Sequence, residues 1–246
     1  MNSTANLMKS VCVFFLAVYE THLKTGYDSK KYSCYKKCLA KTKTTGHIKC
    51  MRAGTIEKKE HLLSEGMKVM RRNGYAATSI DDIVKAAGIP KGSFYNFYAS
   101  KEEFVAEALR FYTDQSRKMQ DAFWNETSLD SKERIRGFFE AMAQGLKKEK
   151  FSTGCFIGNM AQEIGPTHPV LRKVIENCFQ EIKEPLEKEI LRGIREKTIP
   201  SRIRADRFAD FLLNSWEGAI TRMKASKSAV PLDQFLEYLD VLLNQK

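Results

Sequence analysis

Apolar residues recur with a helical period over most of the chain from residue 56 onward. The first apolar stripe passes through Leu62, Leu63, Met67 and Met70. It predicts a helix over residues 56–73, which ends at the pair Asn73 and Gly74. Similar stripes predict four long helices further along the chain, over residues 131–150, 168–197, 205–224 and 231–245. The chain is therefore predicted to be all-α.

Shorter elements with clear end signals fill residues 78–101. Thr78 is predicted to cap the second helix, with Asp81 as its capping-box partner, and Ser100 is predicted to cap the fourth helix. Between these caps, the Gly-Ile-Pro sequence at 88–90 predicts a tight turn, and a third, very short helix follows it. A helix, a short turn and a short helix form a helix-turn-helix pattern.

The short third helix combines apolar and polar side chains. Phe94 and Phe97 are spaced to anchor it from one face. Its polar residues are Lys91, Ser93, Tyr95 and Asn96. A short helix that is held on an apolar side and presents a polar side suits the major groove of DNA. A purely structural helical bundle is the alternative, but it would not gather these polar groups on one exposed face.

Residues 56–110 resemble the DNA-binding region of the TetR family of bacterial repressors. The matching residues lie at 74–75, 78–98 and 100–102 and are nearly free of gaps. The resemblance implies a homodimer that binds double-stranded DNA at a palindromic operator and is released by a small-molecule effector. It implies contacts to phosphates and to the groove from seven residues, namely Thr78, Lys91, Gly92, Ser93, Tyr95, Asn96 and Lys101.

The chain departs from the family pattern at the end of the short helix. Many members have Tyr or His where this chain has Phe97, followed by Phe where it has Tyr98. A phenylalanine cannot donate a hydrogen bond to a phosphate. Tyr98 either replaces this contact or packs with its hydroxyl group at the surface.

Residues 102–246 are expected to hold the effector and to form the dimer. The candidates for the effector pocket are Phe111, Phe138, Met142, Cys155, Met160, Phe179 and Trp216. Aromatic and methionine side chains at helical spacing are also the usual content of a closed core. The sequence alone does not separate these two interpretations.

The last two predicted helices carry the most amphipathic sequences of the chain. The residues expected at a dimer interface are Phe211, Ser215, Ala219, Phe235, Leu239 and Leu242. Ser215, Gly218 and Ala219 are small enough for two helices to approach closely. In the alternative interpretation, the two apolar stripes only close the core of one monomer. We favour the dimer, because the TetR family dimerises through its last two long helices.

The segment at 153–160 contains the pair Gly154 and Cys155. It resembles a Gly-Cys segment of a TetR subgroup that responds to electrophiles, such as quinones and acrylate-type compounds, or to oxidants. In the electrophile-sensing members this cysteine is the reactive one. A basic run at 147–150 is expected to lower the pKa of Cys155. In the alternative, Cys155 is an inert small hydrophobic residue, the role that we expect for Cys178.

Residues 1–50 differ in composition from the rest of the chain. Nine lysines and two acidic residues give them a net charge of +7, which leaves only +4 of the total +11 for residues 51–246. Affinity for DNA must therefore come from local clusters of charge. We expect these residues to be a disordered basic leader, or an upstream extension of a protein that starts at Met51.

The leader contains two weak motifs. An apolar run at 11–19 is partly typical of a signal peptide but lacks a clear cleavage site. Cys34, Cys38, His47 and Cys50 deviate from the usual zinc spacings, so no metal is expected. Only two cysteines lie after residue 50, which indicates a reducing, cytoplasmic environment. No apolar run reaches the length of a membrane span.

The predicted organisation is a leader over residues 1–50, a helix-turn-helix domain over 56–101, and a helical ligand-binding and dimerisation domain over 102–246. The expected function is that of a transcriptional repressor that leaves DNA when it binds a small molecule or when a cysteine is modified. In the alternative, the C-terminal domain binds a protein partner. Acid–base candidates such as Glu163, His168 and Asp206 belong to no catalytic motif. We therefore expect neither an enzyme nor a cofactor.

Overall fold

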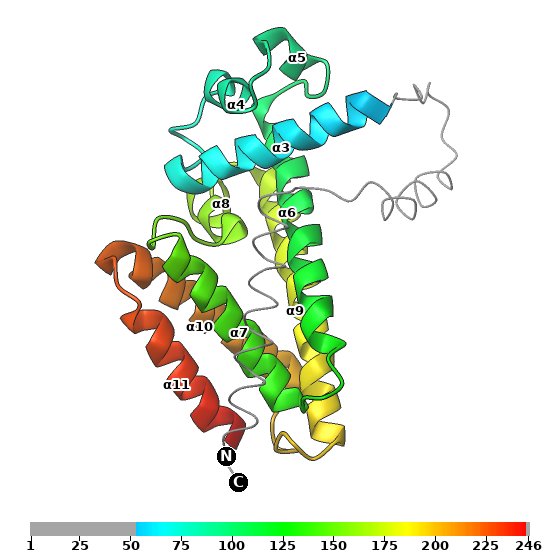
Figure 1. Cartoon of the computed structure of the whole chain (residues 1–246), viewed down its shortest axis with the longest axis vertical. Coiled ribbons are helices and arrows are strands. Elements are labelled where there is room, and N and C mark those ends of the chain that lie inside the picture. The colour runs from blue at the N-terminus through cyan, green and yellow to red at the C-terminus, as the bar shows by residue number, and fades with distance from the viewer. Residues whose placement is uncertain (1–52, 245–246) are drawn as a thin grey trace.

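The computed structural model describes residues 53–244, and this part of the chain is all-α, as predicted (Figure 1). The predicted leader, with its two weak motifs and the start at Met51, lies outside the described residues. The nine helices of the described part are α3 (Ala53–Asn73), α4 (Ile80–Ala86), α5 (Lys91–Tyr95), α6 (Lys101–Trp124), α7 (Ser131–Lys148), α8 (Phe156–Ile164), α9 (Pro169–Arg195), α10 (Ala205–Ser226) and α11 (Val230–Asn244).

The helices form two ends joined by a pair of long helices (Figure 1). Helices α3, α4 and α5 make one end, and α7, α10 and α11 pack together at the other. Helices α6 and α9 lie side by side and run between the two ends. Helix α8 lies between α3 and the bundle of α7, α10 and α11, and it also contacts α6 and α9.

Two hydrophobic clusters hold these groups. The first contains Leu62, Phe94 and Phe104 of the α3–α6 end, and it also includes the buried side chains of α8, such as Met160. The second is centred on Phe139 of α7 and takes in the buried faces of α10 and α11. Burying one large apolar side chain contributes roughly 1.5–3 kcal/mol. Helix α8 therefore belongs energetically with the α3–α5 end.

The ends of the helices agree with the capping signals, with one shift. The Ser100 hydroxyl accepts the N–H of Glu103 at 3.2 Å and caps α6, as predicted. At α4, however, the cap is Ser79 and not Thr78. The Ser79 hydroxyl accepts the N–H of Asp82 at 3.1 Å, and the Asp82 carboxylate accepts the N–H of Ser79 at 2.8 Å. The predicted capping box was one residue early.

A buried ion pair fixes the end of the molecule that is farthest from α5. Arg134 and Glu189 are both almost fully buried, and Arg134 Nε donates to Glu189 Oε1 at 2.8 Å. The same guanidinium donates to the carbonyl oxygens of Glu126 and Leu129 in the loop between α6 and α7. The pair therefore joins α7, α9 and that loop.

None of the helices between residues 53 and 244 is long and apolar enough to cross a membrane.

Candidate functional site

Helices α4 and α5 are joined by a turn whose geometry requires glycine. Gly88 has φ +63°, a conformation that glycine adopts without strain. The N–H of Gly88 donates to the Lys85 carbonyl at 3.2 Å, and the N–H of Ile89 donates to the Val84 carbonyl at 3.0 Å. These two bonds form a Schellman motif, which ends α4 and directs the chain into α5.

Helix α5 is anchored from one side and exposed on the other. The Phe94 side chain is fully buried, with its ring centroid 5.7 Å from that of Phe104. A Cβ atom added to Gly92 would meet no atom within 4 Å, so the protein's own packing does not require glycine there. The predicted contact residues Lys91, Gly92, Tyr95 and Asn96 are exposed, and Ser93 is partly exposed. The polar face that the sequence predicts is therefore present.

The second anchor of α5 is Tyr98, whereas the sequence predicted Phe97. Tyr98 is 1% exposed, and its ring lies 5.5 Å from Phe94 and 5.2 Å from Phe104 between centroids. Phe97 is only partly buried. Burial raises the pKa of Tyr98, and its hydroxyl is enclosed. Tyr98 therefore neither reaches a phosphate nor packs with its hydroxyl at the surface.

The structure turns Thr78 inward. Its side chain is fully buried, and its hydroxyl donates to the Gly74 carbonyl at 2.7 Å. In this structure the Thr78 hydroxyl is therefore not accessible for the expected contact to a phosphate. The same inward orientation explains why the neighbouring Ser79 caps α4.

The two lysines predicted to contact DNA are engaged within the protein. Lys91 forms an exposed ion pair with Asp81 at 3.0 Å, a contact that contributes little and leaves the lysine free to exchange partners. Lys101 donates to the Tyr75 carbonyl at 2.5 Å and lies 3.9 Å above the Tyr75 ring. Burial lowers the pKa of Lys101. Lys101 therefore also organises the loop between α3 and α4.

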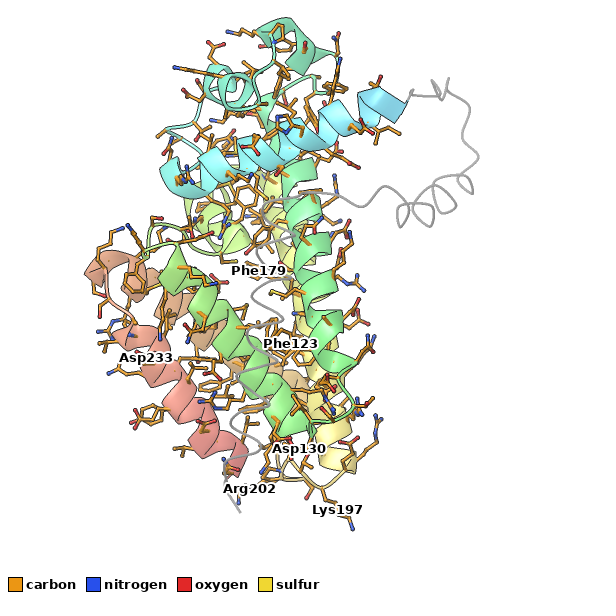
Figure 2. All side chains as sticks on the ribbon, viewed as in Figure 1. Phe123, Asp130, Phe179, Lys197, Arg202 and Asp233 are labelled. Carbon is orange, nitrogen blue, oxygen red and sulfur yellow. The ribbon has the colours of Figure 1, made fainter. Side chains whose placement is uncertain are left out.

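A cavity of about 150 Å³ lies where α3, α6, α7 and α10 meet the N-terminal end of α8. Five of the seven predicted pocket residues line it, namely Phe111, Phe138, Met142, Cys155 and Trp216. The prediction was wrong for Met160, which is fully buried in the first hydrophobic cluster, and for Phe179, which packs against the same cluster. Phe179 lies nearer the α3–α5 end than Phe123 does (Figure 2).

The sequence analysis missed the polar part of the cavity wall. Helix α3 contributes Lys68 and Arg71, so the wall includes a helix of the helix-turn-helix end. Its other polar residues include Gln115 and Gln120 of α6 and Glu217 of α10. In the sequence these residues look like ordinary polar positions of amphipathic helices, and no local signal separates them from solvated ones.

Cys155 is the N-cap of α8 and lies against Glu217. Its sulfur accepts the N–H of Gly158 at 3.4 Å. Burial, together with the hydrogen-bonded Glu217 carboxylate, raises the pKa of Cys155, so the expected lowering by the basic run was wrong. Burial also raises the pKa of Glu217. A Cβ atom at Gly158 would lie 2.2 Å from Glu217 Oε2, so only glycine leaves room for this carboxylate. Cys178 is buried core, as expected.

Helix α8 and the loop before it are bonded to α3 and to the turn that follows α3. At the N-terminal end, Arg71 of α3 donates to the Gly154 carbonyl from Nε at 3.3 Å and from Nη2 at 3.1 Å. At the C-terminal end, Glu163 accepts the N–H groups of Tyr75 at 2.7 Å and Ala76 at 3.1 Å. The Cys155 site and the helix-turn-helix end are thus connected by direct hydrogen bonds.

The acid–base candidates do not converge. Glu163 is occupied by the two backbone N–H groups, and Asp206 pairs with Arg204 at 3.0 Å, which lowers the pKa of Asp206. His168 Nδ1 hydrogen-bonds to the Thr167 hydroxyl at 2.8 Å. These groups form no catalytic arrangement.

Helices α10 and α11 leave an apolar groove on the surface. Its wall includes all six residues predicted for a dimer interface, among them Phe211, Ser215, Ala219, Phe235 and Leu242, with exposed Tyr238 beside them. A Cβ atom at Gly218 would meet nothing within 4 Å. The sixth residue, Leu239, also borders the groove but is 1% exposed and belongs to the monomer core. Phe235 is shared, because its ring packs against Phe139 and Trp216.

Comparison with known proteins matches both ends of the described chain to one family. Residues 62–108 match the model of bacterial regulatory proteins of the tetR family, and residues 131–239 match the model of the tetracyclin repressor-like C-terminal domain. The HTH-type transcriptional repressor DhaR of Mycobacterium sp. (strain GP1) is 36% identical over 72% of this chain and 88% of its own length. The transcriptional regulator AcuR of Cereibacter sphaeroides is 28% identical over 72% of this chain and 80% of its own.

A solved structure agrees with the fold. The crystal structure of a regulatory protein TetR from Rhodobacter sphaeroides superimposes with a TM-score of 0.70 at 26% identity. The match covers 73% of this chain and 95% of that one.

Proposed function

The chain belongs to the TetR family of bacterial regulatory proteins, which are DNA-binding transcriptional regulators and not enzymes, and from this premise we propose that it is an effector-released repressor. The observation that carries the proposal is the shared wall of the cavity. Arg71 of α3 and Cys155 at α8 border the same space, so occupation of the cavity acts directly on the DNA-binding end. The relative DhaR is a transcriptional repressor, which supports repression over activation.

For DNA recognition we propose that α5 enters the major groove. Lys91, Gly92 and Ser93 form its first turn, where base edges are read, and Tyr95 and Asn96 follow on the exposed side. Lys91 exchanges Asp81 for a phosphate, which exposed pairs allow at little cost. We propose the domain limits that the sequence predicts, with the DNA-binding unit over residues 56–101 and the effector and dimer domain over 102–246.

For the dimer we propose that a second copy of this chain covers the groove between α10 and α11. Two copies of a helix-turn-helix read two half-sites about 34–36 Å apart. Phe211 is 51% exposed and Tyr238 is 66% exposed, an apolar surface that a monomer leaves in water. Gly218 presents open backbone in the middle of this face, which permits close approach of a partner helix.

For release we propose that Cys155 is alkylated by small electrophiles, in the manner of the subgroup with the Gly-Cys segment. The raised pKa keeps the thiol protonated near neutral pH, so reaction requires a proton acceptor. Glu217 is hydrogen-bonded to the thiol, and its own raised pKa makes it a stronger base than an exposed carboxylate. In an addition to an activated alkene, sulfur bonds to the β-carbon as the C=C π bond breaks, the thiol proton passes to Glu217, and Glu217 then gives that proton to the α-carbon.

The test uses N-ethylmaleimide as the probe and the DNA upstream of the protein's own gene as the operator. Fluorescence anisotropy at a stated salt concentration should give a Kd at least tenfold weaker after alkylation. The variant Cys155→Ser should keep its affinity after the same treatment, and Cys178→Ser, which removes only a core cysteine, should respond like the wild type. Equal loss of affinity in Cys155→Ser and the wild type would overturn the cysteine mechanism.

A C-terminal domain that binds a protein partner was the alternative. A closed core would favour that alternative, but the described part of the chain contains a cavity with polar groups in its wall. The small-molecule interpretation is therefore the one that the geometry supports.

A further inference from the structure

Gln120 of α6 is a polar side chain with an unused hydrogen-bonding atom at the cavity. Its residue is 0% exposed, and it lines the cavity together with Phe138 and Trp216. Its Nε2 donates to the Ile182 carbonyl of α9 at 3.1 Å. Its Oε1 is buried, and no group of residues 53–244 donates to it. A buried acceptor without a donor costs roughly 1–3 kcal/mol, so a group that donates here gains that much.

The orientation of this amide is fixed by its neighbour. The two ends of a glutamine amide differ, since nitrogen only donates and oxygen only accepts. A carbonyl oxygen such as that of Ile182 only accepts, so Nε2 must face it and Oε1 must occupy the other position. Flipping the amide would place two acceptors in contact. The unused atom is therefore an acceptor, and its missing partner is a donor.

The size and the walls of the cavity limit what can supply that donor. A dry, apolar cavity of about 150 Å³ is large enough to hold benzene, and this cavity has the same volume. Most of its wall is apolar, with aromatic contributions from Phe111, Phe138 and Trp216. A ligand of roughly six to eight non-hydrogen atoms with an apolar body is the expected fit.

The charged groups of the wall argue against an ionic ligand. The Arg71 guanidinium is engaged with the Gly154 carbonyl and with Glu149 at 3.6 Å, and Lys68 Nζ pairs with Glu65 at 2.6 Å, so binding an anion would have to break these contacts. The Glu217 carboxylate is hydrogen-bonded to the Cys155 thiol, so a cation would have to compete with that contact. Moving an ion into an apolar site without full pairing is strongly unfavourable.

We propose that the effector of this cavity is a small, neutral, mainly apolar molecule whose hydroxyl or N–H group donates a hydrogen bond to Gln120 Oε1. Phenol and short alcohols or amides of similar size represent the class. The inference rests on the proposed function in one respect, since it takes the cavity to be the effector site.

The test compares phenol with toluene, which have the same size and shape but differ in the donor. Isothermal titration calorimetry on the full chain should show that phenol binds about five- to tenfold more tightly than toluene, the effect of one net hydrogen bond. Gln120→Met keeps the length of the side chain and removes both polar atoms, so its preference for phenol should disappear. Gln115→Met, on the same helix and also at the cavity, is the matched control and should retain the preference.

Several outcomes would overturn the inference. Equal affinities of the wild type for phenol and toluene would mean that a water serves Gln120 Oε1. A preference that survives in Gln120→Met, while circular dichroism reports a folded variant, would place the donor contact elsewhere. Tighter binding of benzylamine, a cation at neutral pH, than of phenol would contradict a neutral ligand.

Failure of the inference is distinct from failure of the proposed function. A protein that loses its DNA after alkylation of Cys155 but shows no preference for phenol refutes only the ligand class. A protein that prefers phenol through Gln120, but whose Kd for DNA is unchanged by phenol and by alkylation, refutes the effector role and leaves the assigned contact in place.

Discussion

Replacing Gly92 by alanine should separate DNA binding from folding. Nothing within 4 Å would touch the added methyl group, and the backbone at Gly92 is compatible with alanine. Alanine in a helix is favoured over glycine by up to about 1 kcal/mol. A gain of that size raises the Tm of a protein of this length by about 2–4 °C. The free protein should therefore be unharmed or slightly stabilised.

The same methyl group should obstruct DNA. We place Gly92 in the first turn of α5, where the backbone approaches the groove most closely. An extra methyl group in a packed contact costs about 1 kcal/mol or more. Two subunits bind one operator, so the loss is about 2 kcal/mol, which corresponds to a Kd roughly 30-fold weaker.

The assay pairs two measurements on each variant. Fluorescence anisotropy with the DNA upstream of the protein's own gene gives Kd, and differential scanning calorimetry gives Tm. Gly137→Ala is the matched control, because its methyl group would meet only the Phe123 ring at an ordinary 3.6 Å in α7, far from α5. It should gain stability and keep its affinity. An unchanged Kd for Gly92→Ala would refute the placement of α5 in the groove. A lowered Tm would refute the inference that the free protein has room for a methyl group at Gly92.

Three further predictions concern the rest of the molecule. Gly218→Leu should turn a dimer into a monomer in analytical ultracentrifugation while the helical circular dichroism signal is kept, because the Cβ atom of the new side chain meets nothing within 4 Å in its own subunit and the side chain lies on the groove. In the wild type, the rate of alkylation of Cys155 should rise as pH passes the raised pKa of Glu217 and then level off until the thiol itself titrates. In Glu217→Gln the rate should instead rise tenfold per pH unit up to the thiol pKa. Identical pH profiles of the two proteins would exclude Glu217 as the proton acceptor. Arg134→Met should lower the free energy of unfolding by about 3–5 kcal/mol, because it leaves the buried Glu189 with only the longer ion pair to Arg192 at 3.9 Å. The double replacement of both residues by methionine should recover most of the loss in chemical denaturation, and an equally unstable double variant would contradict this explanation.

Stability should also depend on pH through Glu217. Its pKa in the folded protein is raised above that of the unfolded chain, so the folded state holds the proton more tightly. The stability that this contributes is present below the ordinary glutamate pKa and is lost as pH rises through the raised value. Cys155 behaves in the same way in the alkaline range, above the ordinary thiol pKa.

Local patterns predicted the helices and most of their ends. Stripes of apolar residues and caps such as Ser100 depend on neighbours within one turn, so the sequence contains them in full. Where two adjacent residues can both serve, the choice depends on the folded core. Thr78 and Ser79 are both good caps, and only the burial of Thr78 decides between them. The same holds for Phe97 and Tyr98, of which the core takes the tyrosine.

Contacts between distant segments were beyond prediction from the sequence. Arg71 and Gly154 are separated by 83 residues, and Glu163 and Tyr75 by 88. Gln120 reaches a carbonyl 62 residues away. Each of these side chains is polar and lies on an amphipathic helix, where solvent is the usual partner. Only the packing of α3, α6 and α8 converts them into buried or bridging groups.

In the proposed release mechanism, these distant contacts couple α8 to the DNA-binding end. The space between α8 and α10 is already filled, since Glu217 lies where a Cβ atom of Gly158 would be. An adduct on Cys155 must therefore enter the cavity or displace α8. Four hydrogen bonds to charged side chains join α8 and its N-terminal loop to α3 and the turn after it. Such bonds contribute about 1.5–3 kcal/mol each when buried and less when exposed. Shifting a two-state equilibrium from 1:99 to 99:1 requires about 5.5 kcal/mol. The summed free energy of the four hydrogen bonds is of that order, so we expect displacement of α8 to move α3 rather than to break these bonds.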